Sequence, residues 1–235
     1  MQNILLTICA RGGSKGIKNK NIRLLQGKPL IYYTIKQAIG WGRAKHIIVS
    51  TDSRKIAILA KKYGAEVPFL RPKTLASDTS SKLDAIRHAM NISEKLFGEN
   101  FDTIIDLDPT SPIRKIEDLN KSLTIFNKVK PDTLFSVTHS RKNPYFNMIE
   151  KNIKGIYLSK KTRRIHRRQD APPVFDMNAS IYIYRREYLK NLKNSSPISK
   201  RSDIYIMDEY SSVDIDREMD FHYIEFLIEK GLVTI

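Results

Sequence analysis

Residues 3–21, NILLTICARGGSKGIKNKN, decide how this chain folds. Residues 4–10 are an apolar run of strand length, which predicts a strand buried in the middle of a sheet. A basic loop follows, and it contains Gly12, Gly13 and Gly16. Sheets of parallel strands bind ligands at the carboxyl ends of their strands, so this loop is the first place to expect a site.

Strand and helix signals alternate through the first half of the chain. Further strands are expected at residues 46–51, 66–70 and 102–108, and helices from Pro29, between Ser53 and Gly64, at 80–97 and at 117–127. Strands separated by helices at this spacing predict a mostly parallel sheet covered on both faces. The expected fold class is therefore α/β, a Rossmann-like three-layer α/β/α sandwich. Its ligand should lie among the loops at 11–21, 71–81 and 108–114.

The pattern changes after residue 132. Residues 140–176 are polar and basic and contain prolines, with one short strand pair expected around residues 152–158. Strand signals return at 179–184 and 204–207, and an amphipathic helix is expected at 217–229. We therefore predict a single domain over residues 1–235, with a small inserted β sub-domain at about 140–176.

The chain carries 41 lysines and arginines against 25 aspartates and glutamates, a formal net charge of +16. Such a charge attracts polyanions in general, whether nucleic acid, acidic lipid or a phosphorylated substrate. The basic residues are spread along the chain apart from one cluster at 163–168. A nucleic-acid binder more often shows one basic helix or an aromatic-studded basic sheet. Charge alone therefore leaves a small anionic substrate and a nucleic acid as alternatives.

The sequence also bears on location. No apolar run approaches the ~18 residues of a membrane-spanning helix. The N-terminus lacks the charged start, apolar middle and cleavage site of a secretory signal. The single cysteine, Cys9, excludes an intramolecular disulfide framework and is expected to be a small core residue of the first strand. These features predict a cytoplasmic protein with no membrane partner.

The loop at residues 10–21 is a candidate phosphate site. Its glycines let backbone N–H groups approach an anion closely, and Arg11 and Lys20 can add charge-assisted hydrogen bonds to phosphate oxygens. It is neither a Walker A loop nor a G-x-G-x-x-G motif. A solvated basic turn after a buried strand has the same composition, so both interpretations stay open on these residues alone.

A second candidate is the segment Val213-Asp214-Ile215-Asp216. In an extended strand, residues i and i+2 point to the same face, about 6–7 Å apart. Two carboxylates placed in this way can bind a hard cation such as Mg²⁺. The alternative is an edge strand in which Asp216 caps the final helix.

Three further polar segments could each bind a ligand or serve only a structural purpose. Residues 70–81 contain Arg71 and a Ser/Thr-rich stretch, which could close over a nucleotide or cap a helix. Residues 108–114, DPTSPIR, follow an expected strand and could also be a proline-rich turn. Residues 167–179 begin with two adjacent arginines, which suit a carboxylate ligand or a solvated surface.

Taken together and in this order, the motifs resemble those of the acylneuraminate cytidylyltransferases, the CMP-sialic acid synthetase family. The resemblance covers nearly the whole chain and rests on ARGGSKGIKNKN, IIVSTD, LRPKTLASDTSS, DPTSPIR and SVDIDREMDF. It implies an enzyme that uses CTP and Mg²⁺. The anomeric hydroxyl of a nine-carbon 2-keto sugar acid attacks the α-phosphate of CTP and pyrophosphate leaves. It also implies a homodimer, and no nucleic-acid partner is expected.

The resemblance assigns roles to individual residues. Catalytic roles fall to Arg11, Lys20 and Asp214, and Mg²⁺ binding to Asp214 and Asp216. The implied nucleotide-binding residues are Arg11, Gly12, Gly13, Ser14, Lys20, Asn21, Arg71, Ser77, Asp78, Thr79 and Ser81. The implied sugar-binding residues are Asp108, Thr110, Ser111, Arg168, Gln169, Asp176 and Asn178. Because the family's inserted region reaches the neighbouring active site, Arg168 is expected to act on the substrate of a second subunit.

Three positions depart from members specific for N-acetylneuraminate. Asp108 replaces a glutamine, Lys82 replaces a small hydroxyl residue, and Asp176 replaces an arginine before Met177-Asn178-Ala179. A carboxylate only accepts hydrogen bonds, so Asp108 and Asp176 would suit a sugar with more N–H donors. This favours N,N'-diacetyllegionaminate, which has two acetamido groups. N-acetylneuraminate and pseudaminate stay as alternatives, Kdo is less favoured, and a non-catalytic nucleic-acid-binding protein is the distant one.

Overall fold

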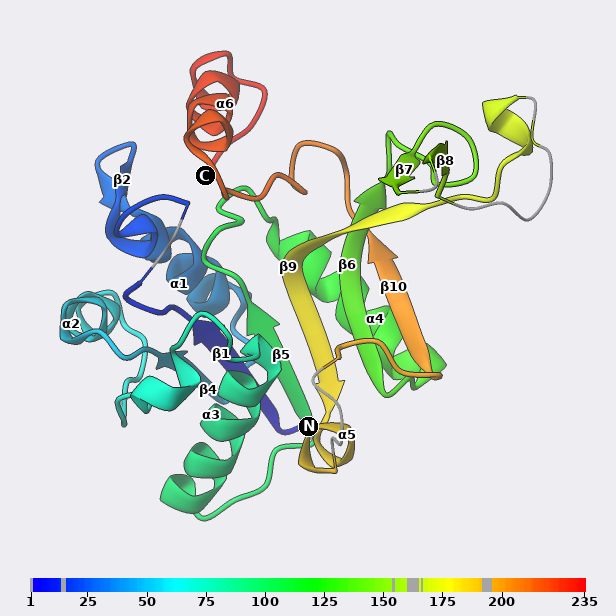
Figure 1. Cartoon of the computed structure of the whole chain (residues 1–235). Coiled ribbons are helices and arrows are strands. Elements are labelled where there is room, and N and C mark those ends of the chain that lie inside the picture. Colours follow the sequence, from blue (N-terminus) through cyan, green and yellow to red (C-terminus); the bar gives the residue numbers. More distant parts are fainter. Residues whose placement is uncertain (1, 14–15, 154, 160–164, 166, 192–195) are drawn as a thin grey trace.

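The computed structural model describes residues 2–13, 16–153, 155–159, 165, 167–191 and 196–235. Its central element is a six-stranded sheet with the order β10-β6-β9-β5-β1-β4 (Figure 1). The strands are β1 Ile4–Cys9, β4 His46–Ser50, β5 Thr103–Leu107, β6 Thr133–His139, β9 Phe175–Arg185 and β10 Ser202–Ile206. All neighbours are parallel except β9, which runs antiparallel to both β5 and β6.

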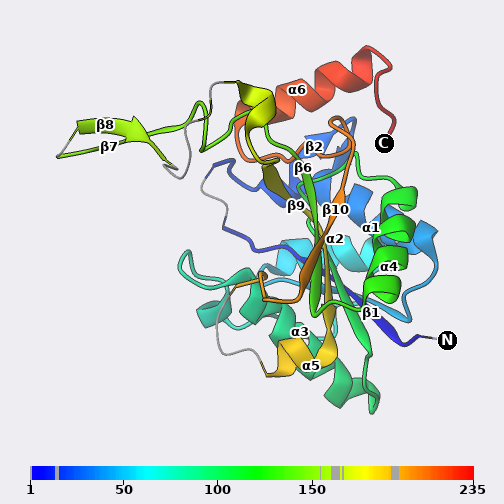
Figure 2. The same cartoon turned by 90° about the vertical axis from the view of Figure 1, so that its right-hand side faces the viewer.

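Helices cover both faces of this sheet. They are α1 Leu30–Trp41, α2 Arg54–Lys62, α3 Lys82–Phe97, α4 Ile116–Val129, α5 Arg186–Lys190 and α6 Glu218–Glu229. Alternate residues of β1 face opposite sides: Leu6 packs in a core shared with α1, α2 and α4, whereas Leu5 packs with α3 and α5. Figure 2 shows α3 and α5 on one side of the sheet and α1 and α4 on the other. This alternation explains the continuous apolar run. It confirms the predicted Rossmann-like α/β/α sandwich.

Most of the predicted elements form, and two regions differ. In the expected strand at 66–70, only Glu66 pairs, in a single bridge with Ile48. Pro68 has no amide hydrogen to continue such a ladder. The sequence did not predict β6, although it lies inside the sheet, and β9 begins at Phe175, four residues before the expected start. The early part of β9 pairs with β6 beyond an irregularity in the register, which a pattern of alternating polarity does not show.

Smaller elements complete the chain. Strands β2 Leu24–Leu25 and β3 Lys28–Pro29 form a hairpin, and short 3-10 helices cover Lys20–Ile22, Lys73–Leu75 and Arg168–Asp170. In the segment between β6 and β9, β7 Ile149–Asn152 pairs with β8 Gly155–Leu158. This two-stranded unit projects from the body of the molecule (Figure 2).

Helix α6 lies beyond the carboxyl end of the sheet (Figure 1). Its residues Phe221, Ile224 and Leu227 pack in one cluster with Leu30 of α1 and with Ile215. Because Ile215 is fixed in this cluster, the positions of Asp214 and Asp216 on either side of it are fixed as well. None of the helices in the described ranges is long and apolar enough to span a membrane.

Candidate active site

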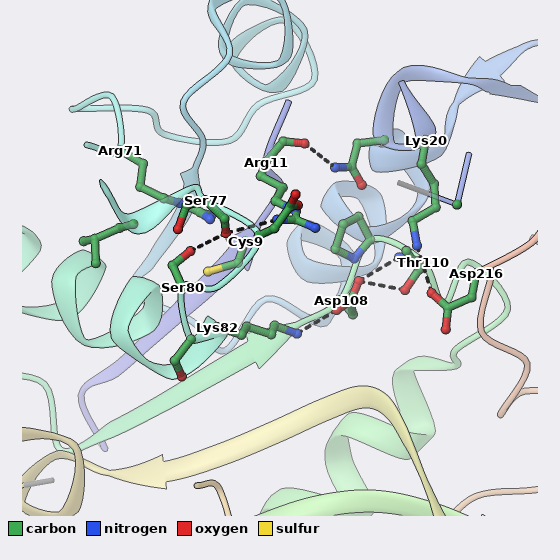
Figure 3. A pocket seen from close by; sticks show the side chains of 16 residues that line it. Cys9, Arg11, Lys20, Arg71, Ser77, Ser80, Lys82, Asp108, Thr110 and Asp216 are labelled. Atoms are coloured by element: carbon green, nitrogen blue, oxygen red, sulfur yellow. Dashed lines mark hydrogen bonds and ion pairs between the residues drawn. The ribbon is translucent and has the colours of Figure 1, made fainter. Parts of the chain in front are cut away.

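A cavity of about 410 Å³ opens where β1 and β5 end (Figure 3). Its lining combines cationic, acidic and hydroxyl side chains from four loops. The lining residues are Cys9, Arg11, Gly16, Lys20, Asn21, Arg71, Leu75, Ser77, Asp78, Ser80, Ser81, Lys82, Asp108, Pro109, Thr110 and Asp216. This is the edge of the sheet at which α/β proteins bind ligands.

The loop after β1 presents two cations to this cavity. Lys20 donates through Nζ to the Ile215 carbonyl at 2.7 Å and to the Asp216 carboxylate at 3.1 Å. Arg11 donates through one terminal nitrogen to the Ser77 carbonyl at 3.1 Å and to the Asp78 carboxylate at 3.0 Å. Each cation pairs with one exposed carboxylate, Asp78 for Arg11 and Asp216 for Lys20, and an anionic ligand could compete with these carboxylates for them.

The same loop needs a glycine at position 16. A Cβ atom there would lie 2.2 Å from the carbonyl oxygen of Asp216, which is far inside van der Waals contact. Gly12 and Gly13 are placed differently. The N–H of Gly12 donates to Asp52 at 2.8 Å, and neither Gly12 nor Gly13 lines the cavity. Ser14 lies outside the described residues.

Arg71 and the segment at 77–81 form the opposite wall. Arg71 is buried, and its Nε donates to the Ser50 hydroxyl at 3.1 Å, at the end of β4. The Ser80 hydroxyl donates to the Ser77 carbonyl at 2.7 Å, and the Ser81 hydroxyl caps α3. The segment therefore does both things that its sequence allowed: it caps α3 and it lines the cavity. Thr79 is exposed and does not line the cavity.

Asn21 lies beneath the basic loop and is 5% exposed. Its amide nitrogen donates to the Arg11 carbonyl at 3.0 Å. Its side-chain oxygen is buried and finds no hydrogen-bond partner among the described residues. An unpaired buried acceptor beside a cavity is a position that a ligand donor can fill.

The turn at 108–114 forms the floor. One carboxylate oxygen of Asp108 accepts from the Thr110 amide at 3.1 Å and from the Thr110 hydroxyl at 2.7 Å. Arg114 is buried and donates to the Ser180 carbonyl at 2.6 Å and to the Thr34 hydroxyl at 3.1 Å. Burial lowers the pKa of Arg114 to about 10, so the side chain stays charged at neutral pH. The sequence had shown Arg114 in a motif but had assigned it no role.

Lys82, the first residue of α3, extends toward this floor. Its Nζ lies 2.7 Å from a carboxylate oxygen of Asp108 and 2.9 Å from one of Asp106. Burial lowers the pKa of Lys82, but the two carboxylates outweigh this effect and raise the pKa well above its ordinary value. Burial by itself would raise the pKa of Asp108, but Lys82 and the hydrogen bonds from Thr110 together outweigh it, so the pKa is lowered.

Asp216 lines the cavity next to Lys20, whereas Asp214, two residues earlier, does not line it. Residues 213–216 form an irregular segment and not the expected strand. Asp216 does not cap α6, because the Asp220 carboxylate accepts from the amides of Asp216 and Arg217. One carboxylate oxygen of Asp214 is buried and unpaired within the described chain. Burial, and next the Asp108 carboxylate, raise the pKa of Asp214 to about 6.

Comparison with known proteins shows which family has this architecture. The family model described as Cytidylyltransferase matches residues 5–230. The chain belongs to the cytidylyltransferase family. It is therefore a CTP-dependent nucleotidyltransferase, as the motifs predicted, and not a non-catalytic nucleic-acid-binding protein.

Individual relatives resemble the chain along its whole length. It is 47% identical to the "Post-translational flagellin modification protein B" of Campylobacter coli, with 99% of this chain and 98% of the relative covered. It is 46% identical to the "CMP-N,N'-diacetyllegionaminic acid synthase" of Campylobacter jejuni, with 97% and 96% covered. The fold is similar to that of a solved CMP:2-keto-3-deoxy-manno-octonic acid synthetase complexed with CTP. That match has a TM-score of 0.72 at 17% identity and covers 98% of this chain and 100% of the other.

The acidic pair of this cytidylyltransferase fits a magnesium ion. Mg²⁺ takes oxygen ligands, commonly one or two carboxylates together with waters and substrate phosphates. Asp214 offers a buried, unpaired oxygen and Asp216 lines the cavity. In the described part of the chain, no group of three or more His, Cys, Asp or Glu side chains could hold a metal. The ion would therefore need further oxygens from the nucleotide.

Five of the predicted sugar-binding residues do not line the cavity: Ser111, Arg168, Gln169, Asp176 and Asn178. Asn178 is buried, and its side-chain oxygen accepts from the Ser136 hydroxyl at 2.6 Å, so it supports the irregular pairing of β6 with β9. Ser111 is fully buried, and Asp176 is exposed on β9. Arg168 donates to the Arg141 carbonyl at 3.0 Å. In this chain, these five residues have structural or surface positions.

Several lining residues had not been assigned individually by the sequence analysis, although Ser80 lies in the stretch expected to close over the nucleotide. They are Cys9, Gly16, Leu75, Ser80, Lys82 and Pro109. Gly16, Ser80 and Pro109 stand inside motifs that had been quoted, so proximity in sequence could have found them. Lys82 had been noted only as a departure from related enzymes. Its partner Asp106 lies within an apolar strand and gave no signal of its own.

Proposed function

We propose that this cytidylyltransferase transfers CMP from CTP to N,N'-diacetyllegionaminate and releases pyrophosphate. The observation that carries the proposal is the cavity at the carboxyl ends of β1 and β5, where Arg11 and Lys20 face a pair of carboxylates. The sugar is supported by the 46% identity, over nearly the full length of both chains, to a protein named for this product.

The chemistry needs positioning and charge neutralisation more than covalent catalysis. In an in-line displacement, the anomeric oxygen of the sugar forms a bond to the α-phosphorus and loses its proton, while the bond to the pyrophosphate oxygen breaks. Arg11 and Lys20 would leave Asp78 and Asp216 to bind phosphate oxygens. Fixed cations that neutralise developing charge in this way contribute a large part of the catalysis.

Mg²⁺ belongs to this proposal. Asp214 and Asp216 would hold it together with phosphate oxygens of CTP, and it would neutralise charge on the triphosphate. The raised pKa of Asp214 supports the assignment, because a buried carboxylate next to other carboxylates is stabilised when a cation joins it.

We also propose that the protein is a homodimer formed through the inserted sub-domain at about 140–176. Isolated two-stranded units are marginally stable in water, and on β7 and β8 Ile149 is 65% and Ile156 64% exposed. A second subunit would cover these side chains. It would also bring Arg168 and Gln169, which lie outside their own cavity, toward the cavity of the neighbour. The proposed location is the cytoplasm, where CTP is made.

Pyrophosphate release with four sugars tests the proposal. The purified protein would be supplied with CTP, Mg²⁺ and, in turn, N,N'-diacetyllegionaminate, its pseudaminate isomer, N-acetylneuraminate and Kdo. We expect the highest kcat/KM with N,N'-diacetyllegionaminate. Equal or better turnover of another nonulosonate would refute the choice of sugar and keep the reaction. No release with any sugar from folded protein would refute the function.

A further inference from the structure

Asp108 had been expected to accept N–H groups of the sugar, but its carboxylate is already engaged. One oxygen accepts two hydrogen bonds from Thr110, and the other lies 2.7 Å from the ammonium of Lys82. A second carboxylate, Asp106, is fully buried and holds the same ammonium at 2.9 Å. Its other oxygen accepts from the Thr7 hydroxyl at 2.7 Å. The acidic groups on this side of the cavity therefore face inward, toward Lys82.

The group that faces the ligand is the lysine. An ammonium has three N–H donors. Lys82 donates one hydrogen bond, to Asp108, and its charge also lies 2.9 Å from Asp106 as an ion pair. Among the residues that the structure describes, no third acceptor lies within hydrogen-bond distance, and the ring of Tyr182 lies 5.1 Å from Nζ. The side chain is 34% exposed and lines the cavity (Figure 3). One donor is therefore available to a ligand.

The position of this donor favours the sugar over the triphosphate. Lys20 and Asp216 lie together at one side of the cavity, and Lys82 and Asp108 meet at another (Figure 3). The triphosphate already has Arg11 and Lys20. The two departures noted in the sequence, at positions 82 and 108, also prove to be one ion pair. Lys82 and Asp108 together add one positive and one negative charge, so the net charge of the cavity that CTP meets is unchanged. The pair does add a hydrogen-bond donor on the side of the cavity away from Lys20.

We propose that Lys82 is a specificity-determining residue of this enzyme. Its ammonium, held by Asp106 and Asp108, donates a hydrogen bond to an acceptor oxygen of the sugar, either the carboxylate or an acetamido carbonyl. Asp108 is then a positioning residue that acts through Lys82 and does not contact the sugar. This inference rests on the proposed function and replaces the earlier expectation for Asp108.

A double-mutant cycle of Lys82→Met and Asp108→Asn tests the proposal. With saturating CTP, we expect Lys82→Met to raise the KM for N,N'-diacetyllegionaminate about 10- to 100-fold, the usual cost of a lost hydrogen bond to a charged group. The dissociation constant for CTP, measured by calorimetry without sugar, should change less than about twofold. If Asp108 acts only through Lys82, adding Asp108→Asn to Lys82→Met should raise the KM no further.

Controls separate this result from misfolding. Lys115→Met removes an exposed ammonium that pairs with Asp208 outside the cavity, and it should leave both constants unchanged. Lys82→Met alone leaves two acidic groups without their cation and could be unstable. In that case the effect of removing Lys82 is measured in the Asp108→Asn background, as the difference between Asp108→Asn and the double variant. The melting temperatures of wild type, Lys82→Met, Asp108→Asn and the double variant show whether Lys82 can be removed from the wild-type protein or only from Asp108→Asn.

The outcomes are distinct. Additive effects of the two substitutions, or equal losses for CTP and sugar, would overturn the proposal. An unchanged sugar KM in Lys82→Met would overturn it while the enzyme remains active. Failure of the wild-type protein with every sugar would instead refute the proposed function. N-acetylneuraminate, which lacks the second acetamido group, identifies the acceptor: a penalty confined to the diacetyl sugar points to that group, and a shared penalty to the carboxylate or the common acetamide.

Discussion

The loop at residues 10–21 and the insertion at 140–176 both carry several basic residues, yet among the residues that the structure describes the loop lines the cavity and the insertion does not. The loop follows directly from the end of β1, so the sheet fixes its place. The insertion leaves the sheet after β6 and extends away from the body (Figure 2). The comparison teaches that a basic segment contributes to the cavity of this chain only where a strand of the central sheet fixes its position; the proposed dimer would give the insertion a role in the cavity of a neighbour.

Replacing cations in the two regions should have the most unequal effects. Lys20→Met should lower kcat/KM about 100- to 1000-fold, because it removes a fixed charge from the reacting phosphates. Lys151→Met, at an exposed position of β7, should stay within about twofold of wild type. Steady-state kinetics with pyrophosphate detection measures both. Equal losses would show that net charge matters and the position of the cation does not.

Subunit complementation sharpens the comparison. Arg168→Ala should lower activity about tenfold or more if this arginine serves the neighbouring site. When Arg168→Ala and Lys20→Met subunits are co-expressed, mixed dimers have one intact site, and about a quarter of wild-type activity should return. If Arg168 acts within its own subunit, no activity returns. Light scattering on the same samples must show dimers, and a monomeric enzyme would refute the assembly.

The backbone of the loop offers a matched pair of glycines. Gly16→Ala places a Cβ 2.2 Å from the carbonyl of Asp216, so the loop or the acidic segment must shift. We expect about a tenfold loss in kcat/KM and a melting temperature lower by several degrees. Gly13→Ala meets no atom within 4 Å and should leave stability within about 0.5 kcal/mol. A Gly16→Ala enzyme with wild-type kinetics would contradict the close approach.

The last prediction concerns the pKa of Asp214 and its effect on stability. Its pKa rises from an ordinary 3.8 to about 6, so the folded protein binds this proton more tightly than the unfolded chain does. The resulting stability is present below pH ~4 and is lost as the pH rises through about 6. Asp214→Asn imitates the protonated group. It should raise the free energy of unfolding at pH 7.5 in EDTA by about 2 kcal/mol, while activity is lost.

Denaturant unfolding of both proteins between pH 4 and 8 checks this prediction. The difference between Asp214→Asn and wild type should grow as the pH rises and should shrink when Mg²⁺ and CTP are added to both. If Asp214→Asn is less stable than wild type at pH 7.5, burial does not destabilise the ionised carboxylate of Asp214, and the prediction is wrong.

The sequence predicted those parts of the fold in which one local pattern determines one element. The apolar run of β1, the cap of α3 at Ser81 and the loop cations Arg11 and Lys20 all lie where their neighbours in sequence indicate. The site also depends on contacts between distant residues. Lys82 meets Asp106 and Asp108 only because β5 and the start of α3 lie side by side. A one-dimensional pattern does not contain that contact.

The sugar-binding prediction shows the same limit. Asn178 stands in a recognisable motif, but the irregular pairing of β9 turns its side chain to Ser136, and Ala179 takes a positive φ of 54°. In this chain, the motif therefore stabilises the irregular part of β9 and does not line the cavity. Arg168 and Gln169 belong to the insertion and do not line the cavity of this chain, which the motif alone did not indicate.

Phosphorus NMR of the complete reaction tests the central claim most directly. With CTP, Mg²⁺ and N,N'-diacetyllegionaminate, the account predicts a new phosphodiester signal and pyrophosphate in equal amounts, and both signals should appear at least about 100-fold more slowly with the Lys20→Met variant. Pyrophosphate without the phosphodiester, or no change in the CTP signals with folded wild-type protein, would contradict it.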